Sequence, residues 1–239
     1  MNQNIVEHLF AFWAEIGDRG GFLNAEKEYS YTTPNQESWP SKVFGLKGTG
    51  FNIDLLKDQI EMGVVPNSVS IYEDKEIAKH LLDQGFTLAS TIKAMAMDIS
   101  NHTGIEIDPM KIEQVDSDEK SRIFANVASE SFGYPVLKTT ISPLFKSQSF
   151  KLFLGKHGDA YGSCGMVYLD KNQIAGIHMI GTLSQFRGRG LGKLMTQHLI
   201  HEAQKNGSQQ IYLVASEAGE RIYQKMGFKN HGTLQSYSL

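Results

Sequence analysis

The segment Arg187-Gly-Arg-Gly-Leu-Gly-Lys193 has the residue types and spacing best suited to chemistry in this chain. Its three alternate glycines let the backbone approach a ligand without interference from Cβ atoms. The segment follows a mostly apolar run of strand length, residues 174–183, and precedes apolar residues at helical spacing. A helix that begins here would present unpaired N–H groups and a partial positive charge, which suit a phosphate-bearing ligand.

Two common phosphate-binding loops do not fit this spacing. The P-loop requires glycine at position 187 and serine or threonine after Lys193, where the chain has Arg187 and Leu194. The dinucleotide fingerprint requires a third glycine at position 193, which is lysine. The pattern that remains is Arg-x-x-Gly-x-Gly, from Arg187 through Gly190 to Gly192, directly after an expected strand.

A second segment lies downstream. Residues 210–216 have the pattern of a strand, and residues 217–226 that of a short helix that carries Tyr223 and closes in Gly227-Phe228. In their order and spacing, the two segments resemble the signatures of the GCN5-related N-acetyltransferases, the GNAT superfamily, which use acyl-coenzyme A. The resemblance covers roughly residues 105–239.

The resemblance implies an α/β fold with a GNAT-like mixed, mostly antiparallel central sheet flanked by helices on both faces. The element pattern agrees, because strands alternate with helices as in an α/β sandwich. The expected elements are a strand at 111–115, helices at 117–132 and 142–149, and strands at 150–154, 162–168 and 174–183.

The resemblance also implies an enzyme, an N-acetyltransferase that transfers acetyl from acetyl-CoA directly to an amine acceptor. The glycine-rich loop would hold the pyrophosphate, the end of the preceding strand would hydrogen-bond the pantetheine arm, and Ser216 suits both a helix N-cap and a further contact to that arm. The expected coenzyme-binding residues are Ile180, Gly181, Thr182, Arg187, Gly188, Arg189, Gly190, Leu191, Gly192, Lys193 and Ser216.

Tyr223 is the expected proton donor, because a phenol with a pKa of ~10 is protonated at neutral pH and can donate to a thiolate with a pKa of ~8.5. Many family members carry a glutamate base on the strand before the loop, but the matching position here is Gly176. His178, two residues further on, is the expected base, acting directly or through water. The alternative role for His178 is structural, with its ring hydrogen-bonded to a neighbouring carbonyl. The proton would then go to Glu130, to Glu217 or to a water chain that leads to solvent.

Two other functions fit the same segments. One is a non-catalytic acyl-CoA-binding sensor whose occupancy controls a partner, although the presence of Tyr223 favours an enzyme. The other is a transferase that uses another acyl-CoA. The acceptor amine, a small molecule or a peptide, is not identified by the sequence.

Composition narrows the range of partners. A formal charge of −3 gives no basic footprint for nucleic acid. No apolar run approaches the ~20 residues of a membrane span, and the first residues lack the basic start of a signal peptide. We therefore expect a cytoplasmic protein without a nucleic-acid or membrane partner, and no metal, with a homodimer left open. The single cysteine, Cys164, is expected to be buried in a strand.

Residues 1–104 are expected to form a degenerate GNAT-like or accessory domain, and residues 105–239 the acetyltransferase domain. The boundary is expected within a polar, turn-rich interval at 101–110. The segment 81–86, Leu-Leu-Asp-Gln-Gly-Phe, is similar to 223–228 at an offset of 142 residues, which also places Gly48 and Gly50 on Gly190 and Gly192. Coincidence between common helix endings is the alternative.

The expected repeat lacks the residues that would bind and react. Gly45 stands where Arg187 is needed and Leu81 where Tyr223 is needed, so we expect no coenzyme in this half. Its first helix has an apolar face that needs a partner surface, and we expect the second half to provide it. That face includes Leu9, Phe10, Phe12 and Trp13.

Overall fold

The computed structural model describes residues 1–35, 37–101 and 111–239. The chain forms two compact units: Met1–Ala96 together with Val214–Leu239, here called the terminal unit, and Met97–Leu213, the central unit. Most of the expected boundary interval, 101–110, lies outside the described residues. The units differ from the expected division in two places: residues 214–239 pack with the N-terminal residues, and the central unit begins at Met97, before the expected boundary.

The central unit contains a five-stranded sheet in the order β10-β9-β8-β7-β6. Only β9 and β10 pair in parallel, and the other neighbours are antiparallel. Its elements, in chain order, are β6 (Ile112–Gln114), α4 (Asp118–Phe132), α5 (Lys138–Ile141), β7 (Phe150–His157), β8 (Ala160–Leu169), β9 (Ala175–Thr182), the 3-10 turn η2 (Ser184–Phe186), α6 (Leu191–Lys205) and most of β10 (Gln210–Ala215).

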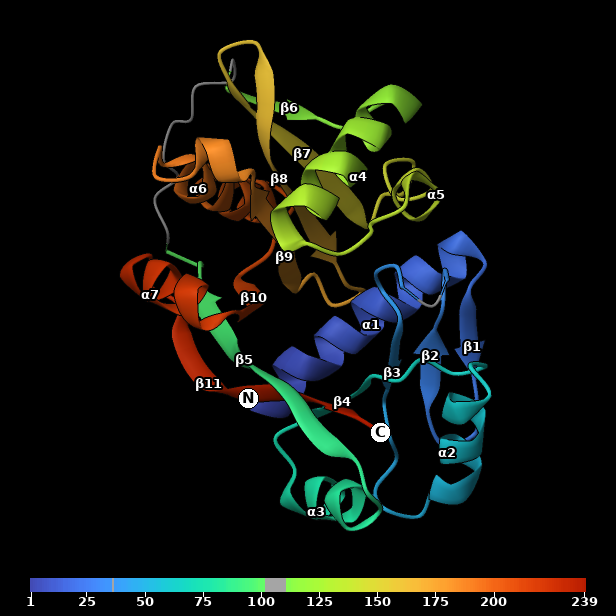
Figure 1. The fold of residues 1–239 in the computed structure, drawn as a ribbon. Coiled ribbons are helices and arrows are strands. Elements are labelled where there is room, and N and C mark those ends of the chain that lie inside the picture. Colours follow the sequence, from blue (N-terminus) through green and yellow to red (C-terminus); the bar gives the residue numbers. More distant parts are fainter. Residues whose placement is uncertain (36, 102–110) are drawn as a thin grey trace. The chain divides into compact units, whose positions relative to one another are not determined.

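Helices α4 and α6 cover opposite faces of this sheet (Figure 1). A Cβ atom added at Gly165 would lie 2.8 Å from Met195 of α6. A Cβ atom added at Gly181, which pairs with Cys164, would lie 2.8 Å from Ser131 of α4. Because successive residues of a strand face opposite sides, adjacent residues 164 and 165 face different helices. The expected mostly antiparallel sheet with helices on both faces is confirmed.

The terminal unit has a sheet in the order β1-β2-β3-β4-β11-β5. The C-terminal strand β11 lies between β4 and β5 and is antiparallel to both, whereas β3 and β4 are parallel. Its elements are α1 (Asn2–Gly20), β1 (Leu23–Ala25), β2 (Ser30–Thr32), β3 (Lys42–Phe44), α2 (Ile53–Glu61), β4 (Val69–Tyr72), α3 (Lys75–Asp83), β5 (Thr87–Asp98), α7 (Glu217–Lys225) and β11 (Lys229–Ser238).

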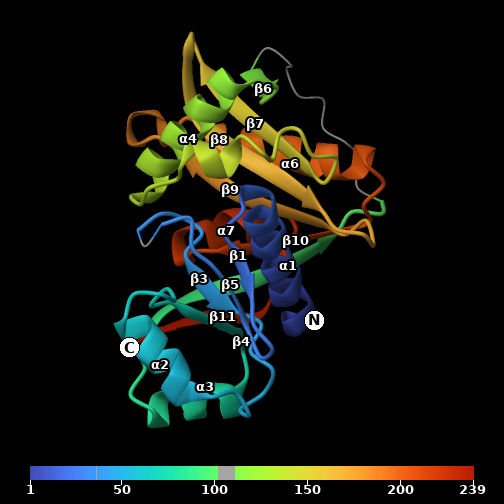
Figure 2. The ribbon, with the colours of Figure 1, turned by 90° about the vertical axis from the view of Figure 1, so that its right-hand side faces the viewer.

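Helix α1 packs on one face of the terminal sheet, and α2 and α3 on the other (Figure 2). Phe44 contacts the rings of Phe10 and Trp13 at centroid distances of 5.5 and 5.7 Å, whereas the adjacent Val43 belongs to the cluster that holds the apolar residues of α2 and α3. The sheet of its own unit therefore covers part of the face of α1 that was expected to need the second half, and the second half of the sequence contributes β11 to this sheet.

The two halves of the chain have matching element orders. With the short α5 and η2 set aside, the order α1-β1-β2-β3-α2-β4-α3-β5 parallels α4-β7-β8-β9-α6-β10-α7-β11. In each series two antiparallel strand pairs are followed by a parallel one. Both α7 and β11 begin 142 residues after α3 and β5, at 217 against 75 and at 229 against 87. These matches support the proposal of a repeat.

The expected helix at 142–149 was wrong. Helix α5 ends at Ile141, and the amides of Leu144 and Ser147 donate to carbonyls three residues earlier, as in tight turns. Pro143 has no N–H with which to continue the helical hydrogen bonding of α5. In the described part of the chain, no helix combines the length and the apolar character that crossing a membrane requires.

Candidate active site

The glycine-rich loop leads into α6 through two left-handed residues. Gly188 has φ of 76° and Gly190, the N-cap of α6, has φ of 81°. Such angles are strained for residues with a Cβ atom, so glycine is required by the backbone itself. The first helical amide with an intrahelical partner is that of Leu194, which donates to the Gly190 carbonyl at 3.0 Å.

The N-terminus of α6 has no side-chain cap. The N-cap side chains of α2, α3, α4 and α7 accept hydrogen bonds from the first turn, whereas α1 and the short α5 lack a side-chain cap as α6 does. The amides of residues 191–193 therefore point out of the helix without a capping oxygen, and the helix dipole adds positive potential there. This arrangement suits a phosphate or pyrophosphate ligand.

Strand β9, which leads to the loop, contains a bulge. Its register with β8 shifts between the pairs Met166–His178 and Cys164–Gly181, so that two residues of β9 oppose one of β8. Met179, within the bulge, has φ of 54°, which is unusual for a residue other than glycine. Because the bulge adds one residue to β9, His178 and Gly181 face the same side of the sheet although they are three positions apart. This is the side that α4 covers.

The end of β9 is less tied to β10 than its start. The recorded parallel pairs join Ala175 and Gly176 to β10, whereas the antiparallel pairing with β8 continues to Thr182. The Thr182 hydroxyl oxygen lies 3.6 Å from the place of a Cβ atom at Gly192. The expected pantetheine-binding strand end and the first turn of α6 are thus adjacent.

Arg187 connects the loop to its surroundings. Its Nε donates to the Thr182 carbonyl at 3.2 Å, and one terminal nitrogen donates to the Ser131 carbonyl at 3.3 Å. The exposed guanidinium therefore joins the end of β9 to the end of α4. These two hydrogen bonds were not expected from the sequence, which predicted only a role of Arg187 in phosphate binding.

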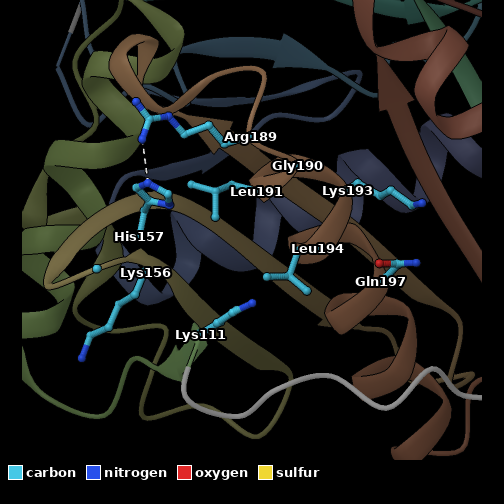
Figure 3. Close-up of a pocket in the computed structure, with 10 residues that line it drawn as sticks. Lys111, Lys156, His157, Arg189, Gly190, Leu191, Lys193, Leu194 and Gln197 are labelled. Carbon is cyan, nitrogen blue, oxygen red and sulfur yellow. Dashed lines mark hydrogen bonds between the residues drawn. The ribbon is translucent and has the colours of Figure 1, made fainter.

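A pocket of about 500 Å³ opens beside the first turn of α6. Figure 3 shows Leu191 and Leu194 between the Arg189–His157 pair and the side chains of Lys193 and Gln197. Arg189 and His157 Nε2 are 2.6 Å apart. The lining residues are Lys111, Lys156, His157, Gly158, Arg189, Gly190, Leu191, Lys193, Leu194 and Gln197.

Two expected site residues, Ser216 and Tyr223, belong to the terminal unit. The Ser216 hydroxyl accepts from the Gly219 amide at 3.3 Å, which confirms its expected role as an N-cap. The half-buried Tyr223 ring packs edge-on against Phe228 at 5.8 Å. Burial raises the pKa of Tyr223 to about 12, so its hydroxyl is protonated at neutral pH.

The candidates for a base differ in accessibility. His178 is buried, with 7% of its surface exposed, whereas Glu130 and Glu217 are exposed. Cys164 is a buried free cysteine, as expected, and burial raises its thiol pKa to about 12, which leaves it unsuited to act as a nucleophile. Among the described residues, no group of three or more His, Cys, Asp and Glu is placed to hold a metal ion.

The structure adds an aromatic pair that we did not expect at the site. Phe132, the last residue of α4, and Tyr134 stack with a ring-centroid distance of 5.6 Å, and both are more than a third exposed. The pKa of Tyr134 is raised to about 12, mainly because its hydroxyl is buried and to a smaller extent because Cys164 lies nearby. Gly133, left-handed at φ of 78°, ends α4 and turns the chain at this point. The segment Ser-Phe-Gly-Tyr-Pro was the available sequence signal.

A family model described as an acetyltransferase (GNAT) domain matches residues 117–237. The chain belongs to the GNAT family. A comparison with curated proteins gave no match. The GNAT acetyltransferase fold supports acyl-CoA-dependent acetyl transfer in general and implies an acyl-CoA cosubstrate and an amine acceptor.

Solved structures resemble this GNAT protein over both compact units. A GCN5-related N-acetyltransferase from Kribbella flavida has a TM-score of 0.71 at 15% identity, covering 94% of this chain and 92% of its own. Another from Sphaerobacter thermophilus has a TM-score of 0.61 at 16% identity, covering 82% and 71%. At such identities the likeness establishes the fold.

Proposed function

We propose that this protein is an N-acetyltransferase that transfers acetyl from acetyl-CoA directly to an amine. The observation that carries the proposal is the uncapped N-terminus of α6, which follows two left-handed glycines and the bulged strand β9. A coenzyme with a pyrophosphate supplies the anion that such a helix end lacks. Its thioester end would then extend along β9.

In the proposed complex, backbone groups hold most of the coenzyme. The amides at residues 188–193 bind the pyrophosphate, with help from the side chains of Arg189 and Lys193. The strand end at 180–182 hydrogen-bonds the pantetheine arm and polarises the thioester carbonyl. Arg187 contributes by holding the loop against Thr182 and Ser131, and it retains further N–H donors for phosphate. Ser216 is proposed as a second contact to the arm.

The reaction forms a C–N and an S–H bond and breaks a C–S and an N–H bond. The lone pair of a neutral amine attacks the carbonyl carbon, and the carbonyl oxygen takes negative charge as the C–N bond forms. When that charge returns, the C–S bond breaks and the thiolate leaves. The nitrogen loses one proton and the sulfur gains one, so the products are an amide and a free thiol. Donors aimed at the carbonyl oxygen supply much of the stabilisation in such sites.

Tyr223 is proposed to assist the departing sulfur. Its pKa of about 12 makes it a weaker acid than a thiol with a pKa of ~8.5. Full transfer of its proton to a free thiolate is therefore uphill. We propose that the phenol keeps its proton and donates a hydrogen bond to the sulfur as the C–S bond breaks, which stabilises the thiolate. His178, directly or through water, is the proposed acceptor of the nitrogen proton, and the thiolate then takes up one proton from water as His178 returns its proton to solvent.

Phe132 and Tyr134 are proposed to contact the acceptor amine. Their exposed rings follow α4, whose Ser131 lies against Gly181 of the proposed thioester-binding strand. Aromatic faces attract cationic ammonium groups and pack against apolar substituents. The acceptor class favoured by this surface is an amine with an apolar or cationic portion beside the reacting nitrogen.

A screen of amines with acetyl-CoA, detected by release of free thiol, tests the proposal. The panel should contain polyamines, aminoglycosides, amino acids and peptide N-termini, with succinyl-CoA and longer acyl donors in parallel. Amine-dependent thiol release is the expected result. Normal binding of acetyl-CoA without turnover on any amine would contradict the enzyme and favour a sensor, and turnover with another acyl-CoA alone would contradict acetyl as the donor group.

A further inference from the structure

Helix α4 has no basic residue of its own in its last turn, although the C-terminal end of a helix favours a cation. Of its last carbonyls, that of Ser129 accepts from the Gly133 amide at 2.9 Å. The carbonyl of Ser131 accepts from the guanidinium of Arg187 at 3.3 Å. The loop before α6 therefore supplies the cation at the end of α4.

The segment that follows α4 is fastened to the same end of this helix. The Ser129 hydroxyl donates to the Ala125 carbonyl at 2.8 Å and accepts from the Val136 amide at 2.8 Å, so it joins the next turn of the chain to α4. Phe132 and Tyr134 lie within this stretch and stack on one another. A movement of the α4 end would therefore move both aromatic rings.

Arg187 is the polar link between this helix end and strand β9. Ser131 packs so closely on β9 that a Cβ atom added at Gly181 would lie 2.8 Å from it. In the part of the chain that the structure describes, the buried Ser131 hydroxyl has no hydrogen-bond partner, so the serine side chain does not tie the two elements together. Arg187 does so, because its Nε also donates to the Thr182 carbonyl at 3.2 Å.

We infer that Arg187 is a positioning residue for the acceptor, which holds the Phe132–Tyr134 pair in place and does so more firmly once coenzyme occupies the loop. The inference rests on the proposed function, since it takes the loop as the coenzyme site and the aromatic pair as the acceptor contact. Of the five N–H donors of a guanidinium, two are bonded to Thr182 and Ser131. The same group can therefore bond a coenzyme phosphate and keep both carbonyls.

The consequence is a coupling between the two substrates. A phosphate bonded to Arg187 restricts its guanidinium, so the bond to the Ser131 carbonyl is formed for a larger fraction of the time. Bound coenzyme should then favour the acceptor, and by linkage the acceptor should favour coenzyme by the same factor. A lysine at this position would keep the charge but lacks the planar fork that bonds several oxygens at once.

Hydrogen exchange of the full chain with and without acetyl-CoA measures this coupling without an acceptor. In the wild type we expect acetyl-CoA to slow amide exchange in two segments, the loop at 188–193 and the α4 end at 131–136, the second by on the order of 10-fold. Slower exchange in the loop alone would overturn the inference and leave the proposed function intact. Slower exchange in neither segment would overturn both, because acetyl-CoA would not bind at the loop.

Arg187→Lys separates the hydrogen bonds of this residue from its charge. We expect the variant to bind acetyl-CoA within a few-fold of the wild type by calorimetry and to protect the loop, but to lose the slower exchange at 131–136. Arg189→Lys is the matched control: it makes the same change in the same loop, at a side chain that contacts His157, and should keep slower exchange in both segments.

Three results would overturn the inference. One is slower exchange at 131–136 that persists in Arg187→Lys, because another contact would then hold the α4 end. Another is a loss of acetyl-CoA affinity of more than on the order of 10-fold in that variant, because Arg187 would then serve the coenzyme itself. The third is loss of the slower exchange at 131–136 in Arg189→Lys, because the effect would not then depend on the bond to Ser131.

Discussion

The loops that precede α2 and α6 both contain left-handed glycines, but the helices that follow them differ in whether a side chain caps the N-terminus. Each contains two left-handed glycines, Gly45 and Gly48 in the first half and Gly188 and Gly190 in the second, with φ between 71° and 81°. The N-terminus of α6 has no side-chain cap, whereas the Asn52 side chain caps the N-terminus of α2. Gly48 and Gly190 match at the offset of 142 residues, whereas Gly45 and Gly188 do not. A left-handed glycine at a matching position therefore does not by itself make a phosphate site.

The first half satisfies its helix N-terminus internally. Asn52 accepts from the Leu55 amide at 3.0 Å, and a carboxylate oxygen of Glu28 accepts from the Asn52 amide at 3.2 Å. A side-chain carboxylate thus occupies the position where a ligand anion would be stabilised. In the second half these interactions are missing at α6, which leaves the same positive potential for a ligand.

The elements around the two loops differ as well. Strand β3, before the first loop, has three residues, whereas β9 has eight and carries the bulge. Leu81 is fully buried in the core of the terminal unit, while its counterpart Tyr223 is half-buried and carries a hydroxyl. If the two halves are a repeat, as we propose, the first half keeps a similar order of elements but has a core-packing leucine where the second half has Tyr223.

The largest expected effect comes from a branched residue at the N-cap of α6. In Gly190→Val the side chain is placed where the pyrophosphate approaches, and we expect the affinity for acetyl-CoA to fall by at least about 100-fold, as measured by calorimetry. At φ of 81° valine also strains the backbone by ~1–2 kcal/mol, so some loss of melting temperature is expected.

Gly48→Val is the matched control for that strain. Gly48 has φ of 71°, and a Cβ atom there would meet nothing within 4 Å, as at Gly190. Both variants should lose similar stability, but only Gly190→Val should lose coenzyme affinity. Equal affinities in the two variants would show that the α6 loop is no more a binding site than its first-half counterpart.

The second largest expected effect concerns Tyr223, whose counterpart in the first half is Leu81. Tyr223→Phe should bind acetyl-CoA normally but turn over more slowly by on the order of 10²-fold, the usual scale for general acid assistance. Because its pKa is raised to about 12, the phenol stays protonated at higher pH than an ordinary tyrosine. The wild-type rate should therefore show no decline from tyrosine ionisation up to about pH 10.

Tyr134→Phe is the matched variant, because it removes another phenol whose pKa is about 12. Tyr134 is proposed to contact the acceptor, so we expect a change of a few-fold in the KM for the amine and unchanged coenzyme affinity. If Tyr134→Phe reduced turnover more than Tyr223→Phe, the two proposed roles would be reversed. The hydrogen-bond donor to the sulfur would then be a residue of the central unit.

The sequence predicted those elements whose pattern is local. Strand β9 was expected at 174–183 and lies at Ala175–Thr182. Apolar runs and helical spacing reflect burial in one element and its nearest neighbours, so they can be read in a short window. The glycine loop and the cap at Ser216 were predictable for the same reason.

Features that depend on distant parts of the chain were not predicted. Strand β11 is largely polar and is held by pairing with β4 and β5, which are far away in sequence. The bulge at Met179 uses a residue type that does not signal a positive φ. Tyr134 was missed because its burial depends on how α4 ends against β9. The caps at Asn52 and Glu28 likewise became evident only when the loop geometry was known.

The smallest expected effect concerns the capped helix of the first half. Asn52→Ala removes the side chain that accepts from Leu55, so the free energy of unfolding should fall by ~1 kcal/mol in urea titrations, the usual value of an N-cap. Affinity and stoichiometry for acetyl-CoA should be unchanged, because we expect this helix end to bind no coenzyme. The double variant Asn52→Ala with Glu28→Gln opens the α2 N-terminus further and still lacks an arginine and a tyrosine at positions 45 and 81. One coenzyme per chain is therefore expected in all three proteins. Two coenzymes per chain in the wild type would show that the first half is a working site. Two per chain in the double variant alone would show that only the Asn52 cap and the Glu28 carboxylate prevent the α2 N-terminus from binding a coenzyme.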